Sequence, residues 1–567
     1  MKKMNFKNIL FSAALAAGAM SLASCSLEEE NPGGFTMENM AANSVESYQT
    51  LLNQCYFGME RFLYGTDGFM ELTEGDTDLW TYQGNQNTSY TQYFWFFAGA
   101  APNTTYTNGI WNSLYDGIGS CNMAISLANK APFKTEAERN VKVAEARFLR
   151  AIYYFNAVEQ FGGVTMITEP ASSMNFAPTR TEPLTIYKEI IIPDLEFAVE
   201  WLDKGNDATT TQPTKKAALG MLAKVCLQTK EYATDEYIPE ALDAAKKLIT
   251  DCESGGSTYG AYMYPTYEEV FAEKNNKENK EALWKHRWYA GSDGHGSSNG
   301  NFKLNRNDEK FLCNINKFGA REDNQTSRLT WEGSQAGIFM PTQYLLNLYV
   351  QQDGTLDPRF HKSFTTQWNA NRNYEWDESS KNNFGKEDAI VGKKLNTGDL
   401  AIKIVMPQDA DYAAEVSKKV TANYLIVDYK DVYDDANKNV ITERGAGENM
   451  FRYFYPSLNK HNSSNYYVAN ASKKRNGNLN ATFIIRMAEI YLIAAEADIY
   501  LNGGANAMGY INKVRQRAGA TLLTGSASVR TVLDERGREF LDEHWRRNDL
   551  IRFGDYERAW GFKYVNP

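Results

Sequence analysis

Apolar residues recur at three- and four-residue spacing over several long stretches of the chain. Over residues 136–161, one helical face carries Val141, Ala144, Phe148, Ile152, Phe155 and Val158, and two glycines follow as a stop signal. The same period predicts helices over residues 215–229, 239–249, 483–501, 505–518 and 529–553. The chain is therefore expected to be mainly α-helical.

Several of these stretches predict tightly packed helical hairpins. Small alanines inside one helix alternate with leucine and aromatic residues on the next, which is typical of tetratricopeptide-like repeats. The last stretch carries charges of both signs at helical spacing: Glu535, Glu539 and Glu543 with Arg536, Arg538 and Arg546. Such spacing favours ion pairs along a solvated or buried polar seam.

Long stretches without a helical period separate the predicted helices. Residues 62–110, 253–340 and 365–480 are rich in Asn, Gly, Ser, Thr and aromatic residues. Loops of this length are usually functional or contain small elements of their own. We expect one domain over residues 41–567, with a helical scaffold and a loop-rich face built from these three insertions.

The N-terminus has the pattern of a cleaved signal. Three lysines precede an uncharged apolar stretch over residues 9–23, which is short for a membrane span, and the four residues that end at Cys25 match a bacterial lipobox. We therefore predict a signal peptide over 1–24 and lipidation of Cys25. The acidic, Pro- and Gly-containing residues 25–40 are predicted to form a flexible tether. The competing interpretation is an ordinary signal with a chance cysteine.

Charge and cysteine usage narrow the function classes. The chain has 60 Lys and Arg against 70 Asp and Glu, and three of these lysines would be lost with the signal peptide. This acidic balance argues against nucleic acid and anionic lipid as partners. Apart from Cys25, the cysteines are Cys55, Cys121, Cys226, Cys252 and Cys313. Their odd number and lack of CxxC spacing favour buried thiols, although one disulfide remains open.

The sequence contains no strong catalytic or metal-binding motif. Ser298 lies in a formal nucleophile-elbow pattern, but its Gly-rich surroundings favour a plain loop. Asp435, Asn437 and Asn439 resemble the start of a calcium loop whose later positions depart from the pattern. We therefore expect no catalytic residues, no metal and no cofactor, with a structural calcium ion left open.

Five segments together resemble the SusD/RagB family. They are AEARFLRAIYYF at 144–155, PTKKAAL at 213–219, RMAEIYLIAAEA at 486–497, INKVRQRAG at 511–519, and ERGREF with WRRNDL within 535–550. With the lipobox they span nearly the whole chain. Family members usually continue to a longer Pro- and Asn-rich ending, whereas this chain stops at Pro567, so truncation and divergence are both open.

The resemblance implies a non-enzymatic surface lipoprotein of the outer membrane. It implies capture of oligosaccharides and a partnership with a SusC-type TonB-dependent transporter, over which the protein acts as a lid. The fold implied is mostly helical, with tetratricopeptide-like pairs as the transporter-facing scaffold. Glu28, Glu29 and Glu30 resemble the family's surface-export signal. Two alternatives remain: a surface-anchored glycoside hydrolase, and a structural repeat or adhesin lipoprotein.

Sugar capture needs flat apolar faces and hydrogen-bonding amides or carboxylates. The early and middle insertions supply both, and the candidate ligand-binding residues are Trp80, Tyr82, Asn85, Trp288, Tyr289 and Trp331. Core packing is the competing interpretation for each aromatic residue. It is favoured for residues 94–97 and Trp111, whereas Trp545 and Trp560 are expected to lie in the core or to face the transporter. The nature of the ligand, glycan or peptide, is left open.

Overall fold

The computed structural model describes most of the chain. The described residues are 36–64, 67–82, 105–170, 177–204, 212–288, 318, 320, 339–434, 439–441, 443–444, 447–461, 466–469, 474–478 and 480–562. Cys25, Cys313, Ser298 and the calcium-like residues Asp435 and Asn437 lie outside them.

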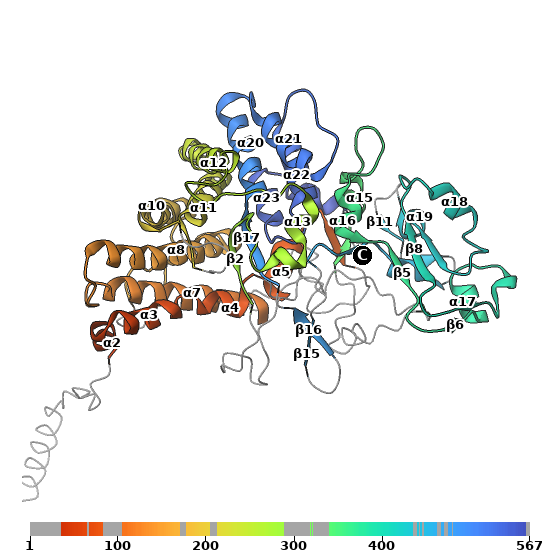
Figure 1. Cartoon of the computed structure of the whole chain (residues 1–567), viewed down its shortest axis with the longest axis horizontal. Helices are drawn as coiled ribbons and strands as arrows, with labels where there is room; N and C mark the ends of the chain where they lie inside the picture. Colours follow the sequence, from red (N-terminus) through yellow and green to blue (C-terminus); the bar gives the residue numbers. More distant parts are fainter. Residues whose placement is uncertain are drawn as a thin grey trace, which may run out of the picture.

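Stacked helices make up the N-terminal half of the protein. Figure 1 shows them from the red end of the chain upward, with α7 beside α8 and α11 beside α12. The elements are α2 (Met37–Asn43), α3 (Val45–Gln54), α4 (Phe57–Phe62), α5 (Asp67–Glu74), β1 (Trp80–Tyr82), α7 (Thr105–Leu127), α8 (Glu136–Phe161), α9 (Pro183–Ile186), the π-helical turn η1 (Tyr187–Ile191), α10 (Ile192–Trp201), α11 (Lys215–Gln228), η2 (Thr229–Tyr232) and α12 (Ile238–Glu253). The predicted scaffold of helical pairs is confirmed.

Local capping fixes where these helices begin and end. The Thr135 hydroxyl accepts a hydrogen bond from the backbone N–H of Glu138, and Gly162 ends α8 at a φ of 72°. The predicted range 136–161 is therefore confirmed. At the N-terminus, Thr36 caps α2 in the same way, so this helix begins at Met37, inside the range predicted as flexible tether.

Glycine allows a close helix approach at the centre of this half. The fully buried ring of Tyr153 on α8 lies against Gly117 on α7, where an added Cβ would sit 2.4 Å from ring carbons. The Tyr153 hydroxyl donates to the backbone carbonyl of Cys55, 2.5 Å away, and accepts from the N–H of Met59. The ring therefore cannot move aside without breaking these bonds.

We predict that Gly117→Ala lowers the free energy of unfolding by about 1–3 kcal/mol, because the added methyl group overpacks the core. Gly119→Ala is the matched control on the same helix, since a Cβ there meets nothing within 4 Å. It should raise stability by roughly 0.5–1 kcal/mol through helix propensity. Urea denaturation of both variants measures the difference. Equal stabilities would contradict the close approach.

The C-terminal helices return to the N-terminal half and pack on it, with α20 against α12 and α21. The elements are β17 (Thr482–Arg486), α20 (Met487–Asn502), α21 (Ala507–Ala518), α22 (Val529–Glu539), α23 (Arg546–Arg552) and η7 (Glu557–Phe562). Residues 483–486, predicted as helix, form strand β17 instead. The predicted continuous stretch 529–553 is also wrong, because Asp542 and His544 adopt positive φ angles of 57° and 62° between α22 and α23.

The third predicted insertion forms a β-rich lobe with its own hydrophobic core, on the right of Figure 1. Trp376, Phe384, Ile402 and Val427 are among its buried residues. Strands β5, β8 and β9 form its three-stranded sheet, in which β8 and β9 are parallel. Its elements are β4 (Phe364–Thr365), β5 (Gln367–Asn369), β6 (Tyr374–Glu375), α17 (Glu378–Asn383), η5 (Asp388–Ile390), β7 (Lys394–Leu395), β8 (Leu400–Val405), α18 (Tyr412–Ser417), β9 (Leu425–Asp428), α19 (Tyr429–Val432), β10 (Tyr433–Asp434), β11 (Asn439–Val440), β12 (Glu443–Arg444), β13 (Gly447–Glu448), η6 (Met450–Tyr453) and β14 (Ser457–Leu458).

Short elements connect the two cores. They are α13 (Tyr267–Phe271), α14 (Glu273–Asn276), β2 (Ala282–His286), β3 (Phe339–Pro341), α15 (Gln343–Leu348), α16 (Arg359–Ser363), and the hairpin strands β15 (Tyr466–Ala469) and β16 (Lys474–Asn478). Trp545 is buried and Trp111 half-buried in the helical core, as predicted. Cys55, Cys121 and Cys226 are buried free thiols, and Cys252 is half-buried and also free. Over the described residues, no helix is long and apolar enough to cross a membrane.

Candidate functional site

The first candidate feature is a strand pair at which the early and middle insertions meet. Strands β1 and β3 are antiparallel, with Trp80 opposite Pro341 and Tyr82 opposite Phe339. Within the early insertion, residues 83–104 follow β1 directly. Within the middle insertion, residues 289–338 come directly before β3 at Phe339. The pairing therefore places one end of each insertion side by side.

A second strand pair holds the other end of the middle insertion. Strand β2 is antiparallel to β17, with His286 opposite Thr482. Just beyond β2, the indole N–H of Trp288 donates to the Thr482 hydroxyl at 3.1 Å. Residues 462–480 enter β17 at the same point. We call the two pairs, β1–β3 and β2–β17, the loop roots.

Two consecutive residues, Glu543 and His544, tie the loop roots together. At the end of β17, the Nε of Arg486 donates to the Glu543 carboxylate at 2.8 Å. The backbone N–H of His544 donates to Glu74 at 3.0 Å, and the other oxygen of Glu74 accepts from the indole N–H of Trp80 on β1. The segment between α22 and α23 therefore holds the roots of separate insertions in one arrangement.

The structure corrects two of the predicted ligand-binding residues. Trp80 is fully buried, in a T-shaped contact with the ring of Phe339, and Trp288 is 5% exposed. Neither ring offers a face on which a sugar could stack, so the prediction of ligand contact is wrong for both. The side chain of Tyr82 and all of Asn85, Tyr289 and Trp331 lie outside the described residues, and their predicted role stays a prediction.

Trp80 was misplaced because its polar sequence neighbours are themselves buried. Both oxygens of Asp78 accept from Arg546 at 2.8 Å, and Arg558 adds a third bond at 2.9 Å. One oxygen of the buried Asp76 carboxylate accepts from the Nε of Arg547 at 3.2 Å. These partners lie nearly 500 residues away along the chain, so no local pattern marks the acidic turn as buried.

Burial shifts the titration of the groups between the loop roots. Removal from water raises the pKa of Glu74 to about 8, despite its bonds to Trp80 and His544, so this carboxyl group holds a proton near neutral pH. Burial lowers the pKa of the His544 imidazole to about 3. Both groups are therefore neutral at pH 7, which reduces the cost of burying them.

We predict that His544→Asn weakens the acid sensitivity of the fold. Because the folded-state pKa is about 3 and the ordinary value is 6.5, the neutral imidazole contributes stability that is present above pH 6.5 and lost as pH falls toward 3. Asparagine tolerates the positive φ at this position. Between pH 7 and 5, the variant should lose about 2 kcal/mol less stability than the wild type.

Urea denaturation of both proteins at the two pH values measures this difference. Glu74 contributes to the pH dependence with the opposite sign, but it is present in both proteins, so its contribution largely cancels. A His544→Asn profile parallel to the wild type would show that the buried imidazole does not set the acid response.

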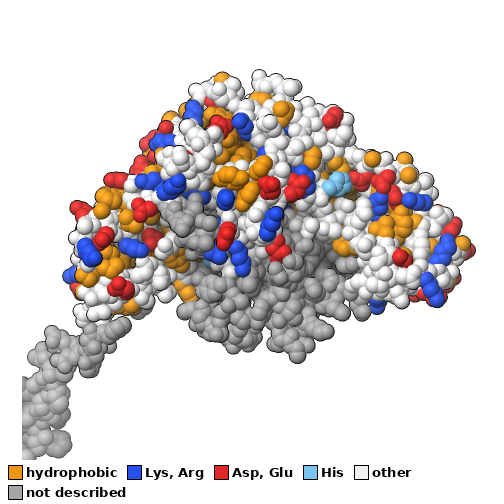
Figure 2. Space-filling model, in the orientation of Figure 1, with side chains coloured by type: hydrophobic (Ala, Val, Ile, Leu, Met, Phe, Trp, Pro, Cys, Tyr) orange, Lys and Arg blue, Asp and Glu red, His pale blue; other side chains and the backbone are white. Residues whose placement is uncertain are grey.

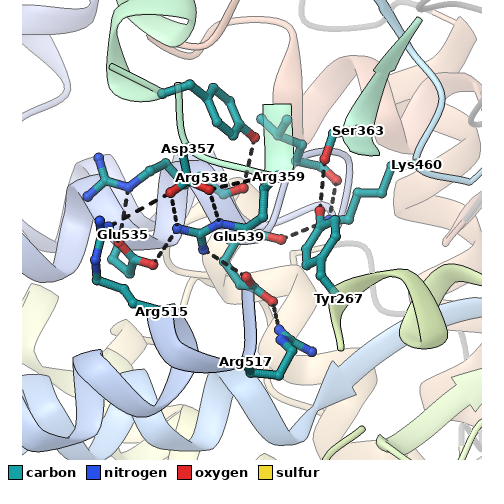
Figure 3. A network of polar contacts seen from close by, with 12 residues as sticks. Tyr267, Asp357, Arg359, Ser363, Lys460, Arg515, Arg517, Glu535, Arg538 and Glu539 are labelled. Atoms are coloured by element: carbon teal, nitrogen blue, oxygen red, sulfur yellow. Dashed lines mark hydrogen bonds and ion pairs between the residues drawn. The ribbon is translucent and has the colours of Figure 1, made fainter. Parts of the chain in front are cut away.

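Within the predicted seam of charges, Glu535 on α22 pairs with Arg538 at helical spacing, at 3.0 Å, and both glutamates of α22 are fully buried. Figure 3 shows Arg359, which is fully buried, reaching both Glu535 and Glu539, at 2.8 and 2.9 Å. Arg517 and Arg486 also bind Glu539. Burial opposes ionisation, but these arginines hold the pKa of Glu539 below its ordinary value. The network joins α16 beside the β-rich lobe to the C-terminal helices.

Over the described residues, no group of three or more His, Cys, Asp or Glu side chains is placed to hold a metal ion. Figure 2 shows basic and acidic side chains interspersed on this face of the molecule. The described part of the site consists of the two loop roots, the neutral side chains of Glu74 and His544 between them, and a charged network that reaches β17 through Arg486.

Comparison with known families gives two consecutive matches. Residues 280–567 match the profile of the "SusD family", and residues 30–227 match the profile "Starch-binding associating with outer membrane". A "SusD-like protein" of Bacteroides ovatus is 30% identical over 191 residues, which cover 32% of this chain and 33% of that relative. The "Starch-binding protein SusD" of Bacteroides thetaiotaomicron is 45% identical over 71 residues, 12% of each chain. These alignments span a third or less of the relatives' lengths.

Solved structures are similar over most of the chain. A SusD homolog from Bacteroides thetaiotaomicron has a TM-score of 0.64 at 19% identity, covering 92% of this chain and 88% of that one. A "Laminarin binding SusD-like protein" has a TM-score of 0.58 at 21% identity, with 91% and 93% covered. A structure with a xylogluco-oligosaccharide has a TM-score of 0.55 at 18% identity, with 91% and 84% covered. At these identities the similarity establishes a shared fold.

Proposed function

Because this chain belongs to the SusD/RagB family, we propose that it is a glycan-binding lipoprotein of the outer-membrane surface. In this proposal it captures an oligosaccharide and delivers it to a SusC-type TonB-dependent transporter. The family match over residues 280–567 is the observation that carries the proposal. The relatives named for binding starch, laminarin and a xylogluco-oligosaccharide support a neutral glycan as ligand.

The proposed capture site is the surface formed by the insertions that leave the loop roots. Three insertions have an end at β1–β3 or β2–β17, so aromatic residues far apart in sequence can serve one ligand. With Trp80 and Trp288 buried, the remaining candidates are Tyr82, Asn85, Tyr289 and Trp331. Their aromatic rings would cover the C–H faces of a sugar, and the amide would bind its hydroxyl groups.

The proposed anchor is a lipid on Cys25 after removal of residues 1–24. The lipobox, the acidic residues that follow it and the family profile named for outer-membrane association support this location. Helix α2, the first described element, begins at Met37. The eleven residues 26–36 would then be the link between lipid and folded scaffold.

Binding to a glycan panel tests the proposal. The unlipidated chain, residues 26–567, is run through affinity gels that contain starch, laminarin or xyloglucan, and binding is quantified by calorimetry. We expect retention by at least one glycan, with Tyr289→Ala or Trp331→Ala weakening it by about three- to tenfold through loss of a stacked ring. Reducing sugar measured in the same mixtures should not increase.

The control variant is Tyr262→Ala, which removes an aromatic ring that is 39% exposed between α12 and α13, outside the segments 83–104 and 289–338 that leave the loop roots. Its glycan affinity should equal that of the wild type. Retention that is insensitive to both insertion variants would contradict the proposed site. Release of reducing sugar would contradict a binding role without catalysis and favour the hydrolase alternative.

A further inference from the structure

A cleft of about 260 Å³ lies among α15, α21 and α22. Figure 1 shows these helices in the upper half of the molecule, whereas the hairpin β15–β16 lies at the lower edge. The cleft is lined by Leu348, Val350, Gln351, Gln352, Asp357, Arg515, Leu523, Arg530, Thr531, Asp534 and Arg538. It is therefore a hollow built wholly from described residues, separate from the loop roots.

The floor of the cleft is one end of the buried charged network. In Figure 3, Arg515 and Arg538 lie on either side of Glu535. Arg515 binds Glu535 at 2.8 Å and Arg538 binds it at 3.0 Å. The Arg538 Nη1 also donates to the backbone carbonyl of Leu348 at 2.9 Å. These bonds fix the guanidinium planes, so the polar wall is preorganised.

The charges of the lining favour a neutral ligand over an anion. Each lining arginine already has a carboxylate within 3.0 Å: Glu535 for Arg515 and Arg538, and Asp534 for Arg530. An incoming carboxylate or phosphate would lie near these carboxylates and compete with them for the same donors. A neutral ligand avoids both costs.

The cleft has hydrogen-bonding capacity left for such a ligand. Among the described residues, neither the Arg538 Nη2 nor the side-chain amide of Gln352 has a hydrogen-bond partner, and Gln352 is exposed at the rim. The lining also includes the apolar side chains of Leu348, Val350 and Leu523. A lining that combines available donors with apolar side chains suits a molecule with C–H faces and hydroxyl edges.

We propose that this cleft is a second ligand site, which takes a neutral polyhydroxylated molecule of about one sugar ring. The volume of about 260 Å³ is below the range of roughly 300–1,000 Å³ for sites that enclose larger ligands. The guanidinium of Arg538 and the amide of Gln352 bind hydroxyl groups, and the leucine and valine side chains cover the ring. The site is independent of the loop-root surface.

Ligand-observed NMR titration of residues 26–567 tests this site. The probes are D-glucose, N-acetyl-D-glucosamine and D-glucuronate. We expect saturable binding of at least one neutral probe and weaker binding of glucuronate. Gln352→Ala should weaken the neutral probe by about fivefold through loss of a hydrogen bond. Gln352→Trp should abolish its binding by filling the cleft.

Matched variants separate this site from the loop-root surface. Lys246→Trp places the same indole on an exposed position of α12 and should leave binding of the probe unchanged. Trp331→Ala should also leave it unchanged. The proposal is overturned if no neutral probe binds saturably, if glucuronate binds more tightly, or if Gln352→Trp has no effect. Loss of probe binding in Trp331→Ala alone would assign it to the loop-root surface instead.

Discussion

Replacing Arg486 with methionine is expected to lower the free energy of unfolding by about 3–5 kcal/mol, because it leaves buried carboxylates without their partner. Arg486 is fully buried at the end of β17. Its guanidinium binds Glu539 at 2.7 Å, Glu543 at 2.8 Å and Glu281 at 3.1 Å. Methionine keeps the length of the side chain and removes its charge, so the loss reports the interactions rather than a cavity.

Urea denaturation at pH 7 measures this effect, and Arg139→Met provides the control. Arg139 pairs with Glu136 on the surface at 2.9 Å, where an ion pair contributes about 0–1 kcal/mol. A loss below 1 kcal/mol in Arg486→Met would show that the remaining cations of the network redistribute to satisfy the carboxylates. Burial opposes ionisation of Glu543, but Arg486 and Lys460 hold its pKa below its ordinary value. The stability that this ionised carboxylate contributes through Arg486 is lost as pH falls below about 4.5, so the difference between Arg486→Met and the wild type should shrink there.

Asp78→Asn is expected to destabilise the protein by a similar amount, about 3–5 kcal/mol. The carboxylate is completely buried and satisfies Arg546 through two bonds and Arg558 through a third. Burial alone would raise the pKa of Asp78, but the two arginines hold it below its ordinary value. Asparagine cannot neutralise them. The backbone carbonyls of Asp78 and Leu79 accept from the hydroxyl and the N–H of Thr342, which follows β3. Disturbing this turn should shift the first loop root, so glycan affinity should fall as well.

The control for Asp78→Asn is Asp388→Asn, which removes the same charge from an exposed pair with Lys381 at 2.8 Å. Its stability should lie within about 0.5 kcal/mol of the wild type. Denaturation and glycan calorimetry are measured on the same preparations. An Asp78→Asn protein with wild-type stability would contradict the account of how the acidic turn holds the first loop root.

Helices with strong local signals could be predicted from the sequence. Helix α8 has an apolar stripe, a threonine cap and a terminal glycine, and its predicted bounds match the structure. Strand β17 could not be predicted, because its apolar run continues without interruption into α20 and only the partner strand β2 distinguishes the two. The break after α22 was missed for a different reason: Asp542 and His544 adopt left-handed conformations that tertiary contacts stabilise.

The candidate site was predicted by region rather than by residue. The sequence indicated correctly that Glu535 pairs with Arg538 at helical spacing. The arginines that bind Glu539 come from other segments of the chain and were not predicted. It misplaced Trp80, whose acidic neighbours indicate exposure to solvent but pair with arginines from the far end of the chain. Burial that depends on such distant contacts has no local signature in the sequence. The class of protein could be predicted because it rests on the family motifs.

Hydrogen–deuterium exchange with and without a retained glycan shows which segments of the protein contact the ligand. The unlipidated chain is saturated with the glycan that binds in the affinity gels, and peptides across the whole sequence are compared. We expect protection to be concentrated in residues 83–104 and 289–338, the parts of the early and middle insertions that leave the loop roots. Protection confined to the scaffold helices α7–α12 at full saturation, with no change in either insertion, would contradict the proposed capture site.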